Sequence, residues 1–162
     1  MADRLKALGY ATCAIGKWHL GGPPDYLPMK RGFDEFYGTV ANTPFFTLLL
    51  RRFARLGRGE GGQGPQLLHH KDEKRRTFAA MMSAMDDAVG RVMARVRERG
   101  QEENTLVFFF SDNGGPTANT TSKNDPLRGF KATTLEGGIR IPFCFPWKGT
   151  VPAGKVYDEP II

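Results

Sequence analysis

Two stretches of the chain, one long and one short, have hydrophobic patterns that predict a helix and a strand. Between Asp72 and Gly100, apolar residues recur at three- and four-residue spacing and lysine and arginine fill the other face, which is typical of an amphipathic helix. The apolar positions are Phe78, Met81, Met82, Met85, Val89, Val92, Met93 and Val96. Residues Thr105–Phe110 form a continuous run of β-branched and aromatic residues, which predicts a strand buried on both faces.

The start of the chain adds a short helix and a strand. Residues 2–9 are predicted to be helical, and Gly9 closes this helix because glycine tolerates the left-handed conformation. Residues 10–15, YATCAI, then predict a strand. The order strand, helix, strand implies that residues 10–15 and 105–110 pair in parallel through a right-handed crossover. The expected fold class is α/β, with a mostly parallel sheet flanked by helices.

Polar clusters follow both predicted strands. The sequence GKWH follows the first strand, and SDNGG, residues 111–115, follows the second. Ligands in open α/β sheets bind outside the carboxyl ends of the strands. Asp112 and Asn113 offer a carboxylate and an amide carbonyl, the hard oxygen donors that Ca²⁺ or Mg²⁺ prefers. The alternative is that DNGG forms a simple turn.

A third cluster lies in residues 126–143. Arg128 and Lys131 place cations near the possible metal loop, and Gly137 and Gly138 are expected to break the chain before the next strand. Cations beside hard oxygen ligands suit an anionic substrate that also bridges a metal, such as a sulfate or phosphate ester. The alternative for each cation is an ordinary solvated surface charge.

Composition and charge narrow the classes of partner. The 162 residues carry a formal net charge of +6, which permits binding to anions, but no nucleic-acid-binding motif accompanies the charge, so we expect no nucleic-acid partner. The longest apolar run, TPFFTLLL, falls far short of the ~20 residues that span a bilayer, so we expect no membrane partner. The opening residues lack the apolar segment of a secretory signal, and the two cysteines define no disulfide framework.

Taken together, these stretches resemble the sulfatase family, within the alkaline-phosphatase-like superfamily of metal-dependent ester hydrolases. The stretch GYATCAIGKWHLG is similar to the second signature of that family almost residue for residue. Five blocks resemble the family in the same order, at residues 9–21, 27–38, 75–93, 104–115 and 127–143. The resemblance implies an alkaline-phosphatase-like α/β fold.

The resemblance also implies roles for five residues. Lys17 and His19 would contact the substrate sulfate and the formylglycine nucleophile, and Lys131 would contact the sulfate. Asp112 and Asn113 would bind the divalent cation, usually calcium, with magnesium as the alternative. The implied partner is a sulfated small molecule or a sulfated polysaccharide. Family members are often periplasmic, secreted or lysosomal, and the sequence leaves the location of this chain open.

The chain also departs from the family pattern. The formylglycine of the family arises within a C/S-x-P-x-R motif that precedes the GKWH block, and Lys17 stands too close to Met1 for that segment. Residues 1–162 are therefore expected to be a partial catalytic domain, truncated at both ends, with no nucleophile in this chain. CFPWK, residues 144–148, imitates the motif but falls where the family has a plain strand. Cys13 is expected to be a small core residue.

The middle of the chain does not resemble the family. Residues 51–70 are rich in arginine and glycine and are expected to form a flexible basic loop. His69 and His70 fall in the region where the family supplies a further active-site histidine, but they precede KDEK without a proline. They are either site residues or solvated loop residues, and the sequence does not decide between the two.

Two functions remain open at this point. The first is metal-dependent hydrolysis of a sulfate ester, which makes the family member a sulfuric ester hydrolase. The second is that the chain is a catalytically inactive remnant or a basic anion-binding module. Because the nucleophile segment is missing, we expect no turnover from these residues alone. A phosphatase of the same superfamily fits less well, since those relatives lack the GKWHLG block.

Overall fold

The computed structural model describes residues 1–40 and 71–159, which fall into two compact units, Met1–Arg55 and Leu56–Ile162. Each unit is described by itself. The basic loop predicted at residues 51–70 lies outside the described residues, and so do His69 and His70 within it.

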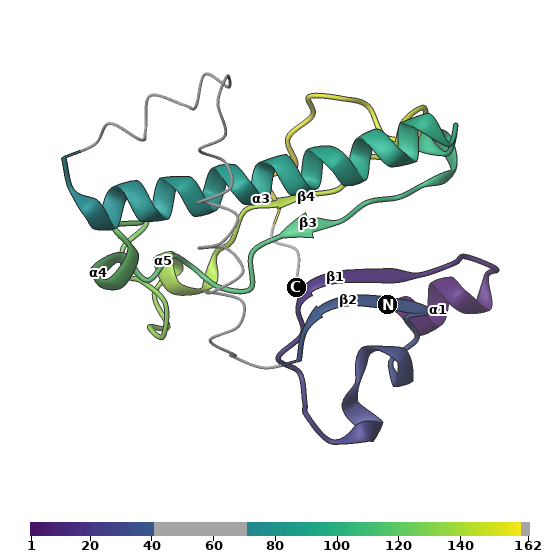
Figure 1. Cartoon of the computed structure of the whole chain (residues 1–162), viewed down its shortest axis with the longest axis horizontal. Helices are drawn as coiled ribbons and strands as arrows, with labels where there is room; N and C mark the ends of the chain where they lie inside the picture. Colours follow the sequence, from purple (N-terminus) through teal and green to yellow (C-terminus); the bar gives the residue numbers. More distant parts are fainter. Residues whose placement is uncertain (41–70, 160–162) are drawn as a thin grey trace. The chain divides into compact units, whose positions relative to one another are not determined.

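The first unit is built on a parallel pair of strands (Figure 1). Helix α1, Ala2–Ala7, precedes strand β1, Cys13–Lys17, and strand β2, Glu35–Thr39, follows two short 3-10 helices. The register pairs Cys13 with Glu35 and Lys17 with Thr39. The helix and the strand predicted at the start of the chain are thus confirmed, although β1 begins and ends later than expected. The 3-10 helices are η1, Pro24–Tyr26, and η2, Pro28–Lys30.

Thr12 and Asp34 fix the beginning of this strand pair. The buried Thr12 donates its hydroxyl to the Gly32 carbonyl at 2.6 Å, and its backbone N–H donates to Asp34 Oδ2 at 2.9 Å. The Thr12 carbonyl in turn accepts the backbone N–H groups of Asp34 and Glu35. The Lys6 ammonium and then the Thr12 donors lower the pKa of Asp34 to about 2. The ionised carboxylate therefore holds β2 in register against the start of β1.

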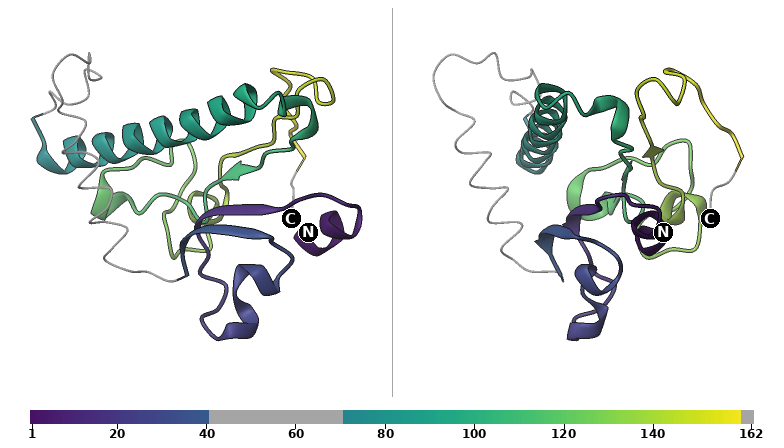
Figure 2. Two further views of the ribbon diagram at one scale, coloured as in Figure 1. Left: turned by 45° about the vertical axis from the view of Figure 1, so that its right-hand side comes forward. Right: turned by 90° about the vertical axis from the view of Figure 1, so that its right-hand side faces the viewer.

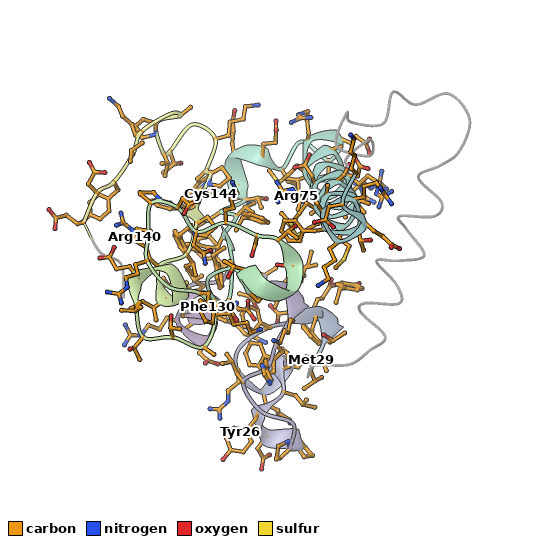
Figure 3. The ribbon with its side chains drawn as sticks, turned by 90° about the vertical axis from the view of Figure 1, so that its left-hand side faces the viewer. Tyr26, Met29, Arg75, Phe130, Arg140 and Cys144 are labelled. Carbon is orange, nitrogen blue, oxygen red and sulfur yellow. The ribbon has the colours of Figure 1, made fainter. Side chains whose placement is uncertain are left out.

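The second unit contains the predicted long helix. Helix α3 runs from Glu73 to Glu98, and Figure 2 shows it as one continuous element. The Asp72 side chain caps its first turn by accepting the Lys74 backbone N–H at 2.8 Å, and the positive φ of Gly100, +65°, follows its end. Arg75 near its start donates to the Thr121 carbonyl at 3.0 Å, which ties α3 to helix α4, Thr117–Thr120 (Figure 3).

The strand predicted at residues 105–110 is shorter and more exposed than expected. Strand β3 covers only Phe109–Phe110 and pairs antiparallel with β4, Phe143–Cys144, after a 3-10 helix, η4, Glu102–Asn104. Phe110 is 56% exposed, so the prediction of burial on both faces is wrong. Phe110 instead packs against Phe143, its partner on β4. Their rings are stacked, with 5.7 Å between the centroids.

The predicted parallel pairing of residues 10–15 with residues 105–110 would join the two units and stays a prediction. In the described part of the chain, β1 pairs in parallel with β2, and β3 pairs with β4. The parallel partner of β1 comes from a segment only about 20 residues further along the chain, whose alternation of polar and apolar residues is too short to predict a strand. The fold class is α/β, with parallel strands and helices, as expected.

Gly137 and Gly138 do not break the chain as predicted. They are buried within a one-turn helix, α5, Glu136–Ile139, that precedes β4. A side chain on Gly137 would overlap the Gly129 carbonyl, and one on Gly138 would overlap the Thr133 carbonyl. These glycines are therefore required by close backbone packing rather than by a turn.

Candidate functional site

Lys17 and His19 lie where β1 ends. The Trp18 backbone N–H donates to the Thr39 carbonyl at 2.8 Å, and the His19 N–H donates to the Val40 carbonyl at 3.0 Å, so backbone pairing continues beyond the last residue of the strand. His19 has φ +48°, a left-handed conformation that turns the chain away from the strand direction. Lys17 is half-buried and His19 is exposed.

Trp18, between these two residues, anchors the segment. Its indole N–H donates to the Tyr26 carbonyl at 2.7 Å, and its ring meets the Phe33 ring edge to face at 5.9 Å between centroids. The Arg31 guanidinium lies 5.0 Å from the centre of the Tyr26 ring. The indole thus fixes the loop after β1 against the 3-10 helices. The two basic side chains flank an anchored residue rather than a freely moving one.

The predicted metal loop follows β3 directly. The Ser111 hydroxyl donates to the Asn113 carbonyl at 2.8 Å, and the Asn113 amide nitrogen donates to the Gly114 carbonyl at 2.9 Å. These bonds tighten the turn and orient the Asn113 carboxamide, whose Oδ1 accepts no hydrogen bond within the described residues. Asp112 is exposed. A carboxylate and an amide oxygen on a tight loop suit a hard cation.

Lys131 is brought to the same loop by its backbone. The Lys131 N–H donates to the Gly115 carbonyl at 3.3 Å, and the Gly114 N–H donates to the Gly138 carbonyl at 2.9 Å. The residues after β3 and those around α5 therefore form one connected cluster. The structure thus places the Lys131 backbone beside Gly115, two residues after Asn113, in the second unit, while Lys17 and His19 are neighbours in the first.

Asn124 is a residue that the sequence analysis missed. Its Oδ1 accepts the Gly115 N–H at 2.9 Å, and its Nδ2 donates to the carbonyls of Gly115 at 3.1 Å and Gly129 at 3.0 Å. The sequence contains one signal of a local role, because Asn followed by Asp-Pro favours a turn, and the Leu127 N–H does donate to the Asn124 carbonyl. Nothing in the sequence predicts the hydrogen bonds from Asn124 to Gly115 and Gly129.

Comparisons with known proteins identify the family of the chain. The family model described as Sulfatase matches residues 51–161, which is more than half of the chain. The chain belongs to the sulfatase family.

Two curated sulfatases illustrate the similarity. The pig N-acetylgalactosamine-6-sulfatase is 29% identical over 216 aligned residues, covering 98% of this chain and 41% of the pig protein. A protein named Sulfatase from Formosa agariphila is 38% identical over 158 residues, covering 86% of this chain and 28% of that protein. This sulfatase chain thus spans about two fifths of the length of the first relatives that it matches. The 216 aligned positions exceed its 162 residues, so the pig protein has residues within the matched span that this chain lacks.

Solved structures share the fold. The crystal structure of Ps i-CgsB in complex with k-i-k-neocarrahexaose matches with a TM-score of 0.75 and 27% identity, over 99% of this chain and 49% of that one. The PsFucS1 sulfatase from Pseudoalteromonas sp. matches in fold with a TM-score of 0.60 over 95% of this chain and 46% of that one. The sulfatase chain therefore has the α/β fold of its family.

The donors in the second unit fit a hard cation in kind but not in number. Asp112 and Asn113 provide one carboxylate and one amide oxygen, whereas Ca²⁺ takes about six to eight oxygen ligands. Across residues 1–40 and 71–159, no group of three or more His, Cys, Asp or Glu side chains could hold a metal ion. A shallow hollow of about 300 Å³ lies beside Asn124 and is lined by none of the five predicted site residues. Asp112 and Asn113 therefore supply two of the oxygen donors that such a cation would need.

The CFPWK segment has a structural role in this sulfatase chain. Lys148 donates to Glu102 at 2.9 Å, and the Trp147 indole N–H donates to the Glu103 carbonyl at 2.8 Å. The Glu102 carboxylate raises the pKa of Lys148, and the Lys148 ammonium lowers the pKa of Glu102. Both shifts favour the ion pair. The lysine that stands in the arginine position of the nucleophile motif is therefore engaged with the turn after α3.

Cys13 is not the core residue that the sequence predicted. It is exposed at the start of β1, on the same face of the strand as Ile15, which is 64% exposed. Partial desolvation, and then the carboxylate of its ladder partner Glu35, raise the pKa of the Cys13 thiol. A raised pKa disfavours the thiolate, so this cysteine is not an activated nucleophile.

Within the described ranges, no helix combines the length and the apolar character that a membrane crossing requires.

Proposed function

We propose that this chain supplies anion-binding and cation-binding groups of a sulfate ester hydrolase. The observation that carries the proposal is the hydrogen bond from the Lys131 backbone to Gly115, because it joins a cationic residue to the loop that holds two hard oxygen donors. A sulfate ester needs both kinds of group, since its charged oxygens are stabilised by cations and by a divalent metal ion.

Each predicted residue has a distinct part in this proposal. Lys17, His19 and Lys131 bind the sulfate oxygens and stabilise the negative charge that develops as the ester bond breaks. Asp112 and Asn113 hold Ca²⁺, or alternatively Mg²⁺, which when bound polarises a sulfate oxygen as a Lewis acid. The nucleophile of the proposed reaction is the formylglycine that the family resemblance implies. No C/S-x-P-x-R motif occurs in the 162 residues.

The proposed substrate class is a sulfated saccharide. One relative is named N-acetylgalactosamine-6-sulfatase, and one structural neighbour is a complex with k-i-k-neocarrahexaose. The net charge of +6 on this chain is consistent with attraction of a sulfated polysaccharide through long-range electrostatic steering. A sulfated small molecule fits the same binding groups.

Calorimetric titration with inorganic sulfate, in the presence of Ca²⁺ and at constant ionic strength, tests the proposal. Lys131→Ala should weaken sulfate binding by about tenfold or more, because a charge-assisted hydrogen bond contributes more than a neutral one. Lys17→Ala and His19→Ala should each weaken sulfate binding as well. The matched control is Lys155→Ala, since Lys155 is exposed and lies near the end of the described residues. Equal sulfate affinity in the Lys131 and Lys155 variants would contradict the proposal.

Anion binding without turnover is the second candidate function. It is favoured by the ion pair of Lys148 with Glu102, which gives CFPWK a structural role in place of a nucleophilic one. Incubation of the purified 162-residue chain with Ca²⁺ and an aryl sulfate separates the two functions. We expect sulfate binding and no turnover from these residues by themselves. Turnover that disappears in Lys17→Ala would instead show that the chain is a complete hydrolase.

A further inference from the structure

Asn124 makes an unusual set of bonds to backbone groups. Its carboxamide pairs with both the N–H and the carbonyl of one residue, Gly115, and also donates to the carbonyl of Gly129. All three distances lie between 2.9 and 3.1 Å, within the normal range for such bonds. Asn124 thus connects two backbone segments that are not paired in a sheet.

These two segments are the ones that carry the candidate site. Gly115 ends the loop of Asp112 and Asn113, and Gly129 comes two residues before Lys131. The Gly115 carbonyl accepts from both Asn124 Nδ2 and the Lys131 N–H. One carbonyl and one carboxamide therefore link the loop of Asp112 and Asn113 to the segment of Lys131.

We propose that Asn124 is a positioning residue that fixes the metal loop relative to Lys131, so that a cation held by the loop and a sulfate held by the lysine lie at a set separation. This inference rests on the proposed function for the roles of the loop and the lysine. The connection itself is a property of the ligand-free chain. It can therefore be tested without either ligand.

Amide hydrogen exchange of the ligand-free 162-residue chain provides the first test. Asn124→Ala should make the Gly115 N–H exchange about tenfold faster, because its hydrogen-bond acceptor is gone. The Lys131 N–H should also exchange faster, although it does not bond to Asn124. The Gly114 N–H, which donates to Gly138, should keep its protection. The matched control is Asn104→Ala, an exposed asparagine outside this cluster, which should change none of the three.

Asn124→Asp separates the two functions of the carboxamide. Aspartate keeps an oxygen acceptor for the Gly115 N–H but loses the donors to Gly115 and Gly129. Gly115 should therefore keep most of its protection, whereas Lys131 should exchange as fast as in Asn124→Ala. Wild-type exchange at Lys131 in both variants would overturn the proposal. If Asn124→Ala fails to fold, exchange at Lys131 in Asn124→Asp still tests the proposal.

A titration with Ca²⁺, followed by backbone amide resonances, tests whether the connection is used by the site. In the wild-type chain, Ca²⁺ should shift resonances from Ser111 to Gly115 and also that of Lys131. In Asn124→Ala the shifts should remain in the loop and disappear at Lys131, an effect that general destabilisation does not produce. Shifts at Lys131 that persist in the variant would contradict positioning by Asn124. An absence of Ca²⁺ shifts in the wild type would contradict the proposed function, while the exchange data would still decide the role of Asn124.

Discussion

Gly38 lies directly across the parallel ladder from Gly16, and a Cβ atom on Gly38 would overlap the Gly16 carbonyl oxygen. The two strands therefore leave no room for a side chain on Gly38, which faces the residue before Lys17. Gly16 itself has φ +124°, a conformation that side chains rarely adopt. The position of Lys17 and His19 thus depends on two facing glycines.

Gly38→Ala should destabilise the first unit by about 1–3 kcal/mol, because the added methyl group forces the two strands apart. A urea titration followed by the amide resonances of β1 measures this loss. The matched control is Gly22→Ala, since Gly22 has no atom within 4 Å of the added carbon. That control should change stability by no more than about 0.5 kcal/mol. Equal unfolding midpoints for the two variants would show that the glycine contact does not hold the ladder together.

The loop that carries Asp112 and Asn113 contains a comparable contact. A Cβ atom on Gly114 would overlap the Gly137 carbonyl oxygen, so Gly114→Ala should destabilise the second unit by about 1–3 kcal/mol. Gly90→Ala is the control within the same unit. Gly90 lies inside α3 with no atom within 4 Å of the added carbon, so that change should stabilise the unit by about 0.5–1 kcal/mol. Chemical unfolding of both variants should thus give shifts of opposite sign, and shifts of the same sign would contradict the account.

The Asp34 carboxylate gives the first unit a defined pH dependence. Its pKa is lowered from 3.8 to about 2 in the folded chain, chiefly by the Lys6 ammonium. A lowered pKa means that the stabilisation is fully present above pH 3.8 and is lost as the pH falls through about 2. Carbon-13 NMR titration of the Asp34 carboxyl should therefore show a midpoint near 2.

Lys6→Met should move this midpoint upward toward 3.8, because the largest cause of the shift is removed. Lys30→Met, at an exposed lysine near the end of η2, serves as the control and should leave the midpoint unchanged. A wild-type midpoint at 3.8 would mean that the contacts of Asp34 with Lys6 and Thr12 are not formed in solution.

The sequence predicted those elements whose signal is local. Helix α3 was predicted because its apolar residues repeat at three- and four-residue spacing from Phe78 to Val96, and its cap at Asp72 and its end near Gly100 are also local features. SDNGG follows β3 directly, as predicted, whereas Gly16 and Lys17 of the GKWH segment lie within β1 rather than after it. Strand partners depend instead on contacts between distant segments. Hence the pairing of β1 with β2, and the exposure of Phe110, could not be derived from the pattern.

In the candidate site, too, the sequence predicted what has a local signal and missed what depends on contacts between distant segments. Lys17, His19, Asp112, Asn113 and Lys131 were selected from motifs, and their roles remain predictions. Asn124 was missed because its function depends on where its carboxamide meets two backbone segments. The close contacts of Gly114 and Gly137 were missed too, since a glycine pair in a sequence indicates a turn as readily as tight packing.

We propose that Asp112 and Asn113 bind a divalent cation, and calorimetric titration of the chain with Ca²⁺ measures this binding. We expect weak binding, roughly in the millimolar range, that becomes about tenfold weaker still in Asp112→Asn, because Ca²⁺ affinity follows the number and charge of its ligands. Asp86→Asn, at an exposed aspartate of α3, should bind Ca²⁺ as the wild type does. Equal Ca²⁺ affinity in the Asp112 and Asp86 variants would contradict the claim.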